Sequence, residues 1–311
     1  MFARLFAQSG LSLDRLRALV EVGACGSIVR AAEGDPARQS QYSRQLKELE
    51  DFFQVALVER HGKGVRLTAR GRELARISRF FLLGMSNFQR GCLAEGQTCR
   101  LGASATFIST FLLPLLAQPN AAQAELRFAV EAASGTDVER RLHDLTLDFG
   151  VVTQTTLSRP LQLKELGRWR LKLWVPTSLC RSRPDAVRAL MTNRLPLAWP
   201  VQEFPLSAVE GMSEREPLLV CATFLEARTA LAAGGVAAVL PDFLDVENPS
   251  GTLLTPRWPA LDSLVFRFSL AWNPRLLRLN PHAARWRDVL IAALTARLAD
   301  PGLSGIGSFR A

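Results

Sequence analysis

Long polar and basic side chains recur on one face of residues 36–53, a segment with the spacing of an amphipathic helix. The buried stripe is expected to comprise residues three or four apart, namely Gln39, Tyr42, Leu46, Leu49 and Phe53. The opposite face carries Arg38, Gln41, Arg44, Gln45, Lys47 and Glu48. Amide side chains hydrogen-bond base edges, and guanidinium groups bind guanine or phosphate. This face therefore suits contact with nucleic acid.

The residues around this helix specify where it starts. Asp35 is a suitable N-cap and Pro36 suits the first helical position. A shorter helix is expected over residues 27–33, ending at Gly34. Two helices joined by a tight connection that contains glycine indicate a helix-turn-helix, whose second helix enters the major groove of DNA.

With these landmarks, residues 13–71 resemble the winged helix-turn-helix of LysR-type transcriptional regulators. The matching residues, in chain order, are Ser27, Ala31-Ala32, Gln39, Ser43, Leu49-Glu50, Leu57-Val58-Glu59-Arg60 and Leu67-Thr68-Ala69-Arg70-Gly71. The gaps between them match without insertions. The resemblance implies sequence-specific binding to double-stranded operator or promoter DNA.

The start of the expected recognition helix departs from the family. The family usually has a Leu, then a small N-capping Ser, then Gln-Pro-Ala, and here those places hold Asp35, Arg38 and 39–41 (Gln-Ser-Gln). The helix is therefore expected to begin almost one turn earlier. The residues expected to contact DNA, from this helix and the hairpin after it, are Arg38, Gln39, Ser40, Gln41, Ser43, Arg44, Arg60, Lys63 and Arg66.

A basic hairpin and a long helix are expected next. Residues 55–60 and 65–67 flank a glycine-containing turn at 61–64, which predicts the wing. Thr68 is expected to cap a helix over residues 69–93. Its apolar stripe, which needs a partner, is Leu74, Ile77, Phe81, Met85 and Phe88. The resemblance implies a linker helix that pairs with a second subunit, in a homodimer or homotetramer.

From Cys99 the pattern changes to alternating strands and helices. Strands are expected at 100–103, 126–132, 149–152, 195–199, 218–221, 236–240 and 264–272, with a second unit starting at 168–175. Helices are expected at 136–145, 223–233 and 285–298. Such an order predicts a mostly parallel sheet with ligands at strand C-termini and helix N-termini.

Residues 97–300 resemble the periplasmic-binding-protein-like effector domain of the same regulators. The supporting stretches are 101–104 (Leu-Gly-Ala-Ser), 147–152 and 234–241. The resemblance implies two α/β lobes with a cleft for a small-molecule effector. The residues expected to face it are Ser104, Thr106, Thr153, Gln154, Trp199, Pro200, Thr223 and Phe224. Helix N-termini favour an anionic ligand, but no distinctive Arg or Lys lies in these loops, so the effector stays open.

The expected architecture is multidomain. An N-terminal all-α winged helix-turn-helix spans residues 11–68, and a linker or dimerisation helix spans 69–96. The α/β effector domain follows, with lobe I at 97–155 and 270–311 and lobe II at 156–269.

Charge and composition agree with binding to nucleic acid. The 311-residue chain is 48% hydrophobic and 22% charged, which is typical of a globular protein. Residues 1–90 hold 15 basic and nine acidic side chains, so they carry +6 of the net +9. An alternative explanation of this excess positive charge is that it only keeps the protein soluble. No apolar run approaches the roughly 20 residues of a membrane span, and the N-terminus is too short for a signal peptide, so we expect a cytoplasmic protein.

Catalytic and metal-binding patterns are missing from the sequence. The five cysteines form no CxxC pair, which favours free thiols; a redox-active pair stays open. The three histidines are scattered, and there is no GxSxG, HExxH or Walker lysine. We expect no enzyme activity, no metal and no cofactor. An alternative is a small-molecule-binding or enzymatic α/β protein with a helical assembly module, and another is a DNA-binding protein without an effector.

Overall fold

The computed structural model describes residues 3–7, 9–61, 64–92, 97–117, 126–210, 212, 215–244, 246, 248, 251–280 and 282–299. Its contacts divide the chain into two compact units, each described below by itself. The first comprises Met1–Gly96 with Arg278–Asn280, and the second comprises Gln97–Leu277 with Pro281–Ala311. Among the described helices, none combines the length and the apolar character needed to cross a membrane.

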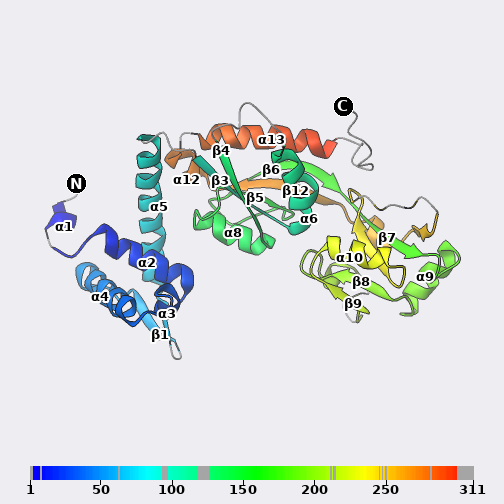
Figure 1. Cartoon of the computed structure of the whole chain (residues 1–311), viewed down its shortest axis with the longest axis horizontal. Helices are drawn as coiled ribbons and strands as arrows, with labels where there is room; N and C mark the ends of the chain where they lie inside the picture. The colour runs from blue at the N-terminus through cyan, green and yellow to red at the C-terminus, as the bar shows by residue number, and fades with distance from the viewer. Residues whose placement is uncertain are drawn as a thin grey trace. The chain divides into compact units, whose positions relative to one another are not determined.

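The first unit is a helical domain with a two-stranded wing (Figure 1). Its elements are α1 (Ala3–Phe6), α2 (Leu13–Cys25), α3 (Ile28–Ala31), α4 (Pro36–Phe53), β1 (Val58–His61), β2 (Gly64–Leu67) and α5 (Ala69–Cys92). Ser12 caps α2 by accepting a hydrogen bond from Arg15 N at 3.3 Å, and Thr68 caps α5 through Gly71 N at 3.0 Å. The Thr68 cap is the one predicted above.

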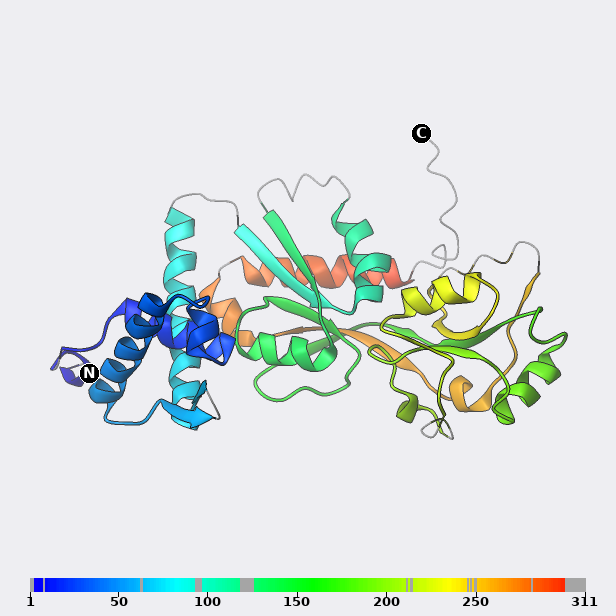
Figure 2. The same cartoon turned by 60° about the horizontal axis from the view of Figure 1, so that its bottom comes forward.

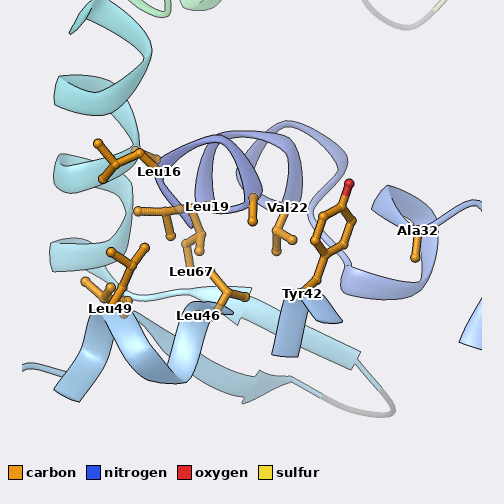
Figure 3. Packing of buried hydrophobic residues seen from close by; sticks show 11 residues of the cluster. Leu16, Leu19, Val22, Ala32, Tyr42, Leu46, Leu49 and Leu67 are labelled. Atoms are coloured by element: carbon orange, nitrogen blue, oxygen red, sulfur yellow. The ribbon is translucent and has the colours of Figure 1, made fainter. Parts of the chain in front are cut away.

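One core holds α2, α4 and the wing together. Figure 3 shows Leu19 and Val22 of α2 facing Leu46 of α4, with Leu67 of β2 between the helices. Leu19, Leu46 and Leu49 are almost completely buried. The predicted stripe of α4 is thus the side that packs, although Gln39 and Phe53 at its ends stay partly exposed.

Two glycines, Gly23 and Gly26, shape the end of α2. α2 continues through Gly23 to Cys25, and Gly26 ends it with a φ of 64°. A Cβ atom on Gly23 would lie 2.8 Å from Cδ1 of Leu67. Gly23 therefore allows the wing strand to approach the helix closely, which local sequence alone does not reveal.

The second unit consists of two α/β lobes (Figure 2). Lobe I contains β3 (Gln97–Ala103), α6 (Ala105–Phe107), the π-helix η1 (Ile108–Leu112), α7 (Leu113–Leu116), β4 (Leu126–Ala132), α8 (Gly135–His143), β5 (Phe149–Val152), β6 (Gln162–Trp169), β12 (Phe266–Trp272) and α13 (Ala283–Ala299). α12 (Pro274–Leu279) lies between β12 and α13 in the sequence. Lobe II contains β7 (Leu171–Pro176), α9 (Arg183–Met191), β8 (Leu197–Pro200), the 3₁₀-helix η3 (Leu206–Ala208), β9 (Leu219–Cys221), α10 (Phe224–Ala232), β10 (Ala237–Pro241), β11 (Leu253–Leu254) and α11 (Pro259–Asp262).

Each lobe has a five-stranded mixed sheet. The orders are β4-β3-β5-β12-β6 and β11-β7-β10-β8-β9. β3 pairs in parallel with β4 and β5, whereas β12 is antiparallel to β5 and β6. The sheets are therefore less parallel than expected, because the chain leaves lobe I after β6 and re-enters it from the other lobe through β12.

The crossings between lobes also differ from the expected boundaries at residues 155–156 and 269–270. Residues 162–169 and 266–272 both belong to the sheet of lobe I. The segment at 168–175 is a junction, where β6 ends at Trp169 and β7 begins at Leu171. Extended chain in either sheet has the same local pattern, so only the pairing assigns these strands to a lobe.

Candidate DNA-binding surface and ligand cleft

The exposed helix α4 starts where the sequence indicates. Oδ1 of Asp35 accepts a hydrogen bond from Ala37 N at 2.8 Å, and Pro36 takes the first helical turn. The preceding connection reverses the chain through Glu33 and Gly34, whose φ angles are 54° and 81°. The predicted early start of the helix is confirmed, and it places Arg38 within the first turn.

Most of the predicted contact residues on α4 are available to a ligand. Arg38, Ser40, Gln41, Ser43 and Arg44 are exposed, whereas Gln39 is half-buried at the edge of the packed stripe. Arg38 donates from Nη1 to Oε2 of Glu33 at 3.2 Å. Its guanidinium group is therefore paired with a carboxylate that a nucleic-acid phosphate would have to replace.

Polar contacts hold α4 on its support. Tyr42 donates a hydrogen bond to Oε2 of Glu21 on α2, and this bond is the main reason why the pKa of Tyr42 is raised. Arg15 on α2 forms an ion pair with Glu48 on α4 at 2.5 Å. Oε1 of Glu50 accepts hydrogen bonds from Leu57 N and Val58 N, at 2.7 and 3.0 Å. The end of α4 is thus tied to the start of the wing.

The wing places its two described arginines on opposite faces. In the antiparallel pair, Glu59 is opposite Arg66 and Arg60 is opposite Val65. Because directly opposite residues share a face and successive residues alternate, Arg60 and Arg66 point to different sides. Both are exposed. Lys63, the third predicted wing residue, lies outside the described residues.

The apolar stripe of α5 is open to solvent. Ile77, Phe81, Met85 and Phe88 are 53%, 47%, 50% and 71% exposed, and Leu74 packs on the core of the domain. Large apolar side chains in a row at helical spacing are rarely left exposed on a monomer. The apolar stripe predicted from sequence is therefore an exposed surface of α5.

A cavity of about 250 Å³ lies in the second unit where the two lobes face each other. Its apolar lining includes the rings of Phe107, Trp169, Phe224, Phe243 and Phe268. These rings come from both lobes and contact one another; for example, the Trp169 and Phe268 centroids are 5.4 Å apart. The hydroxyl residues of the lining are Ser104, Thr106, Ser134, Thr153 and Thr223.

Five of the eight predicted effector residues line this cavity, namely Ser104, Thr106, Thr153, Thr223 and Phe224. Gln154 lies outside the lining and packs on Gly135, where a Cβ atom would lie 2.3 Å from its Nε2. Trp199 and Pro200 are also outside the lining. Trp199 is completely buried and donates from Nε1 to Phe204 O at 2.7 Å, so it shapes the turn that follows β8.

That turn carries Glu203, a cavity residue that the sequence analysis missed. Its Oε1 accepts a hydrogen bond from Thr106 N at 3.0 Å. Its Oε2 accepts from Thr106 Oγ1 at 2.5 Å and from Phe224 N at 2.7 Å. None of the described residues that line the cavity is basic. The helix N-termini that suggested an anionic ligand already donate hydrogen bonds to Glu203, a carboxylate of the chain itself.

Sequence reasoning also missed Trp169, Ser134, Gln202 and Phe243 in the lining. An acidic residue three positions after a buried strand was the available signal for Glu203. No such signal marks the aromatic residues, because they converge from distant segments. The described part of the chain contains no cluster of side chains suited to a metal ion.

Cys25, Cys99, Cys180 and Cys221 are free thiols. Burial raises the pKa of the Cys99, Cys180 and Cys221 thiols. A raised pKa lowers the fraction of reactive thiolate. These three thiols are therefore poor candidates for redox chemistry.

Comparison with known proteins matches both units of the chain. The profile described as bacterial regulatory helix-turn-helix protein, lysR family, matches residues 13–72. The LysR substrate binding domain matches residues 94–295. A curated relative, the HTH-type transcriptional regulator HdfR from Yersinia pestis (strain Pestoides F), is 26% identical over 246 residues, which cover 77% of this chain and 84% of the relative.

Solved structures show the same fold over nearly the whole chain. Full-length OxyR from Pseudomonas aeruginosa has a TM-score of 0.63 at 18% identity, covering 92% of this chain and 95% of that one. Full-length LysG from Corynebacterium glutamicum, with bound effector Arg, has a TM-score of 0.62 at 16% identity, covering 92% and 99%. The chain belongs to the LysR family: it is a DNA-binding transcriptional regulator with a helix-turn-helix domain and a two-lobed substrate-binding domain.

Proposed function

We propose that the protein binds operator DNA as a homodimer or a homotetramer, and that a small molecule in the inter-lobe cavity changes this binding. The observation that carries the proposal is the exposed face of α4, where Arg38, Ser40, Gln41 and Arg44 project from a helix fixed on its opposite side. Gln41 and Arg44 are the side chains suited to base edges, and Ser40 and Ser43 suit phosphate.

Assembly is proposed to occur through α5. Two copies would bury Ile77, Phe81, Met85 and Phe88, which are at least 47% exposed in one chain. Each of these side chains contributes on the order of 1.5–3 kcal/mol when fully buried. A two-fold assembly also presents two copies of α4, as a two-fold operator requires.

The cavity supports the regulatory part of the proposal. Its lining comes from both lobes, so a ligand there binds the closed arrangement more tightly than an open one. Differential affinity of this kind shifts a conformational equilibrium. We further propose that the protein acts in the cytoplasm, without catalysis and without a cofactor. The carboxylate of Glu203 in the lining already accepts hydrogen bonds from three donors.

Fluorescence anisotropy with the region upstream of the protein's own gene tests the DNA-binding proposal. Binding should be sequence-specific and should weaken steeply with salt, because Lys and Arg displace counterions from phosphate. The variant Arg44→Ala should reduce affinity, whereas Arg188→Ala on α9, also a basic surface residue, should not. Equal binding to unrelated DNA at all salt concentrations would exclude a specific regulator.

A further inference from the structure

Glu203 joins the two lobes through the donors that a bound anion would use. Thr106 belongs to lobe I, and Glu203 and Phe224 belong to lobe II. The carboxylate accepts hydrogen bonds from Thr106 N at 3.0 Å, from Thr106 Oγ1 at 2.5 Å and from Phe224 N at 2.7 Å. Two oxygens thus bind three donors from the two sides of the cavity.

Both backbone donors lie in the first turn of a helical segment. Thr106 follows the N-cap Ser104 of the continuous helical stretch 105–116, and Phe224 follows the N-cap Thr223 of α10. Amides in the first turn have no partner within the helix and attract anions. Ser104 binds Phe107 N, and Thr223 binds Glu226 N. Glu203 accepts hydrogen bonds from Thr106 N and Phe224 N, the first-turn amides that these capping side chains do not bind.

The turn that presents Glu203 is held in place. Phe204 N donates to Pro200 O at 2.8 Å, and Val201 N donates to Cys221 O at 3.0 Å. Trp199 stacks on Phe204 with ring centroids 5.5 Å apart. The backbone under Glu203 is therefore anchored to β8 and β9, so the carboxylate is a fixed part of the cavity.

The rest of the cavity suits a ligand without negative charge. Glu203 is the only charged residue among the described lining residues, so an anion beside it would be repelled without a basic side chain to compensate. Five aromatic residues, Phe107, Trp169, Phe224, Phe243 and Phe268, are part of the lining. Trp169 in the lining is 6% exposed, and its Nε1 is buried without a hydrogen-bond partner among the described atoms.

We propose that Glu203 is a built-in carboxylate ligand: it occupies the anion-binding position of the cavity and bridges the lobes, so the intact cavity excludes free carboxylates and accepts a non-anionic, largely apolar molecule. This inference rests on the proposed effector function of the cavity and names the class of effector. It also assigns Glu203 the role of a specificity-determining residue.

Chemical rescue with acetate tests the proposal directly. In the full-length variant Glu203→Ala, acetate should enter the vacated position and bind Thr106 and Phe224. Replacing chloride by acetate at constant ionic strength should raise the melting temperature of this variant by about 3 °C at tenfold excess over Kd. The wild type and Glu210→Ala, which removes an exposed carboxylate seven positions later in the sequence, should show no such difference between the two salts.

The neutral variant Glu203→Gln refines the test. It fills the same space without the charge, so acetate should stabilise it less than Glu203→Ala. An equal acetate effect in wild type and Glu203→Ala would overturn the proposal. If Glu203→Ala does not fold, calorimetric titration of the wild type with benzoate decides: saturable binding that Thr106→Val weakens would equally overturn it.

The result of the acetate and benzoate tests does not depend on DNA binding. A folded wild type that binds no DNA would refute the proposed regulator, whereas the acetate response of Glu203→Ala would still be measured. Conversely, specific DNA binding together with carboxylate binding by the wild type would keep the regulator and remove the role assigned to Glu203.

Discussion

Thr106 donates two hydrogen bonds to Glu203, although the two residues lie 97 positions apart and in different lobes. Thr106 is 1% exposed. The pair therefore connects the two lobes through a buried hydroxyl and a backbone amide. Its strength can be measured without removing the carboxylate.

Thr106→Val removes the hydroxyl and keeps the shape and the amide of the residue. We expect the free energy of unfolding to fall by about 2 kcal/mol, because a hydrogen bond to a charged acceptor is lost in a buried place. Denaturant unfolding measures the change. Thr153→Val alters an exposed hydroxyl of the same cavity and should cost much less; equal losses would contradict a special role for the Thr106–Glu203 pair.

We expect Glu33 to compete with DNA for Arg38, with which it forms an ion pair. Both partners of this ion pair are largely exposed, at 51% and 81%, so the pair itself is weak. Glu33→Gln should release the guanidinium group and remove a charge that repels phosphate. We expect operator affinity to rise about two- to fivefold, corresponding to roughly 0.5–1 kcal/mol.

The gain from Glu33→Gln should shrink in an Arg38→Ala background. Glu165→Gln makes the same charge change in the second unit, next to Arg168, and should leave affinity nearly unchanged. If both Gln variants bind DNA equally well, net charge alone explains the effect.

The wing arginines should contribute unequally, because Arg60 and Arg66 lie on opposite faces of the hairpin. Arg66 is directly across from Glu59, whose carboxylate opposes a phosphate on that side. We expect Arg60→Ala to reduce the salt slope of DNA binding by about 0.9 and Arg66→Ala to change it little. Anisotropy titrations over a series of salt concentrations measure both, and the reverse order would place DNA on the other face.

Phe81→Glu should dissociate the proposed dimer. A carboxylate at the centre of the α5 stripe must be desolvated when two stripes meet, so the dissociation constant should rise roughly 100-fold, or about 2.8 kcal/mol. Sedimentation equilibrium measures the change. Gln89→Glu adds the same charge on the same helix at an exposed polar position and should have little effect; an unchanged dimer in Phe81→Glu would show that assembly uses another surface.

Tyr42 offers a direct measurement of the α2–α4 contact, because it is the only tyrosine in the chain. The hydrogen bond to Glu21 raises the pKa of Tyr42 above the ordinary value of about 10. Since the folded pKa is the higher one, the contact stabilises the fold below pH of about 10, and this contribution is lost as pH rises through the folded pKa.

Tyrosinate absorbance should therefore titrate later in the folded protein than in denaturant. Glu21→Gln should bring the two titrations closer together, since it removes the acceptor charge. Tyr42→Phe should abolish the signal and lower stability at neutral pH by about 1 kcal/mol. Identical titrations in folded and denatured protein would show that the Tyr42–Glu21 bond is not formed in solution.

Local sequence determined the features that depend on residues close together in the chain. Asp35 and Pro36 specify the start of α4 because a capping carboxylate and a fixed φ act within one helical turn. The exposed stripe of α5 follows from the helical period in the same way. The order of strands and helices predicted an α/β domain, and the resemblance to the LysR family implied its two lobes.

Only the tertiary structure decided which distant groups meet. In the folded structure β6 belongs to the sheet of lobe I. Trp199 lies outside the cavity and supports a turn through its hydrogen bond to Phe204 O. Glu203 accepts hydrogen bonds from Thr106 and Phe224. These outcomes depend on strand pairing and on the meeting of segments far apart in the chain, which leave no periodic pattern in sequence. Sequence reasoning left the effector open, and only the folded structure places the Glu203 carboxylate in the cavity.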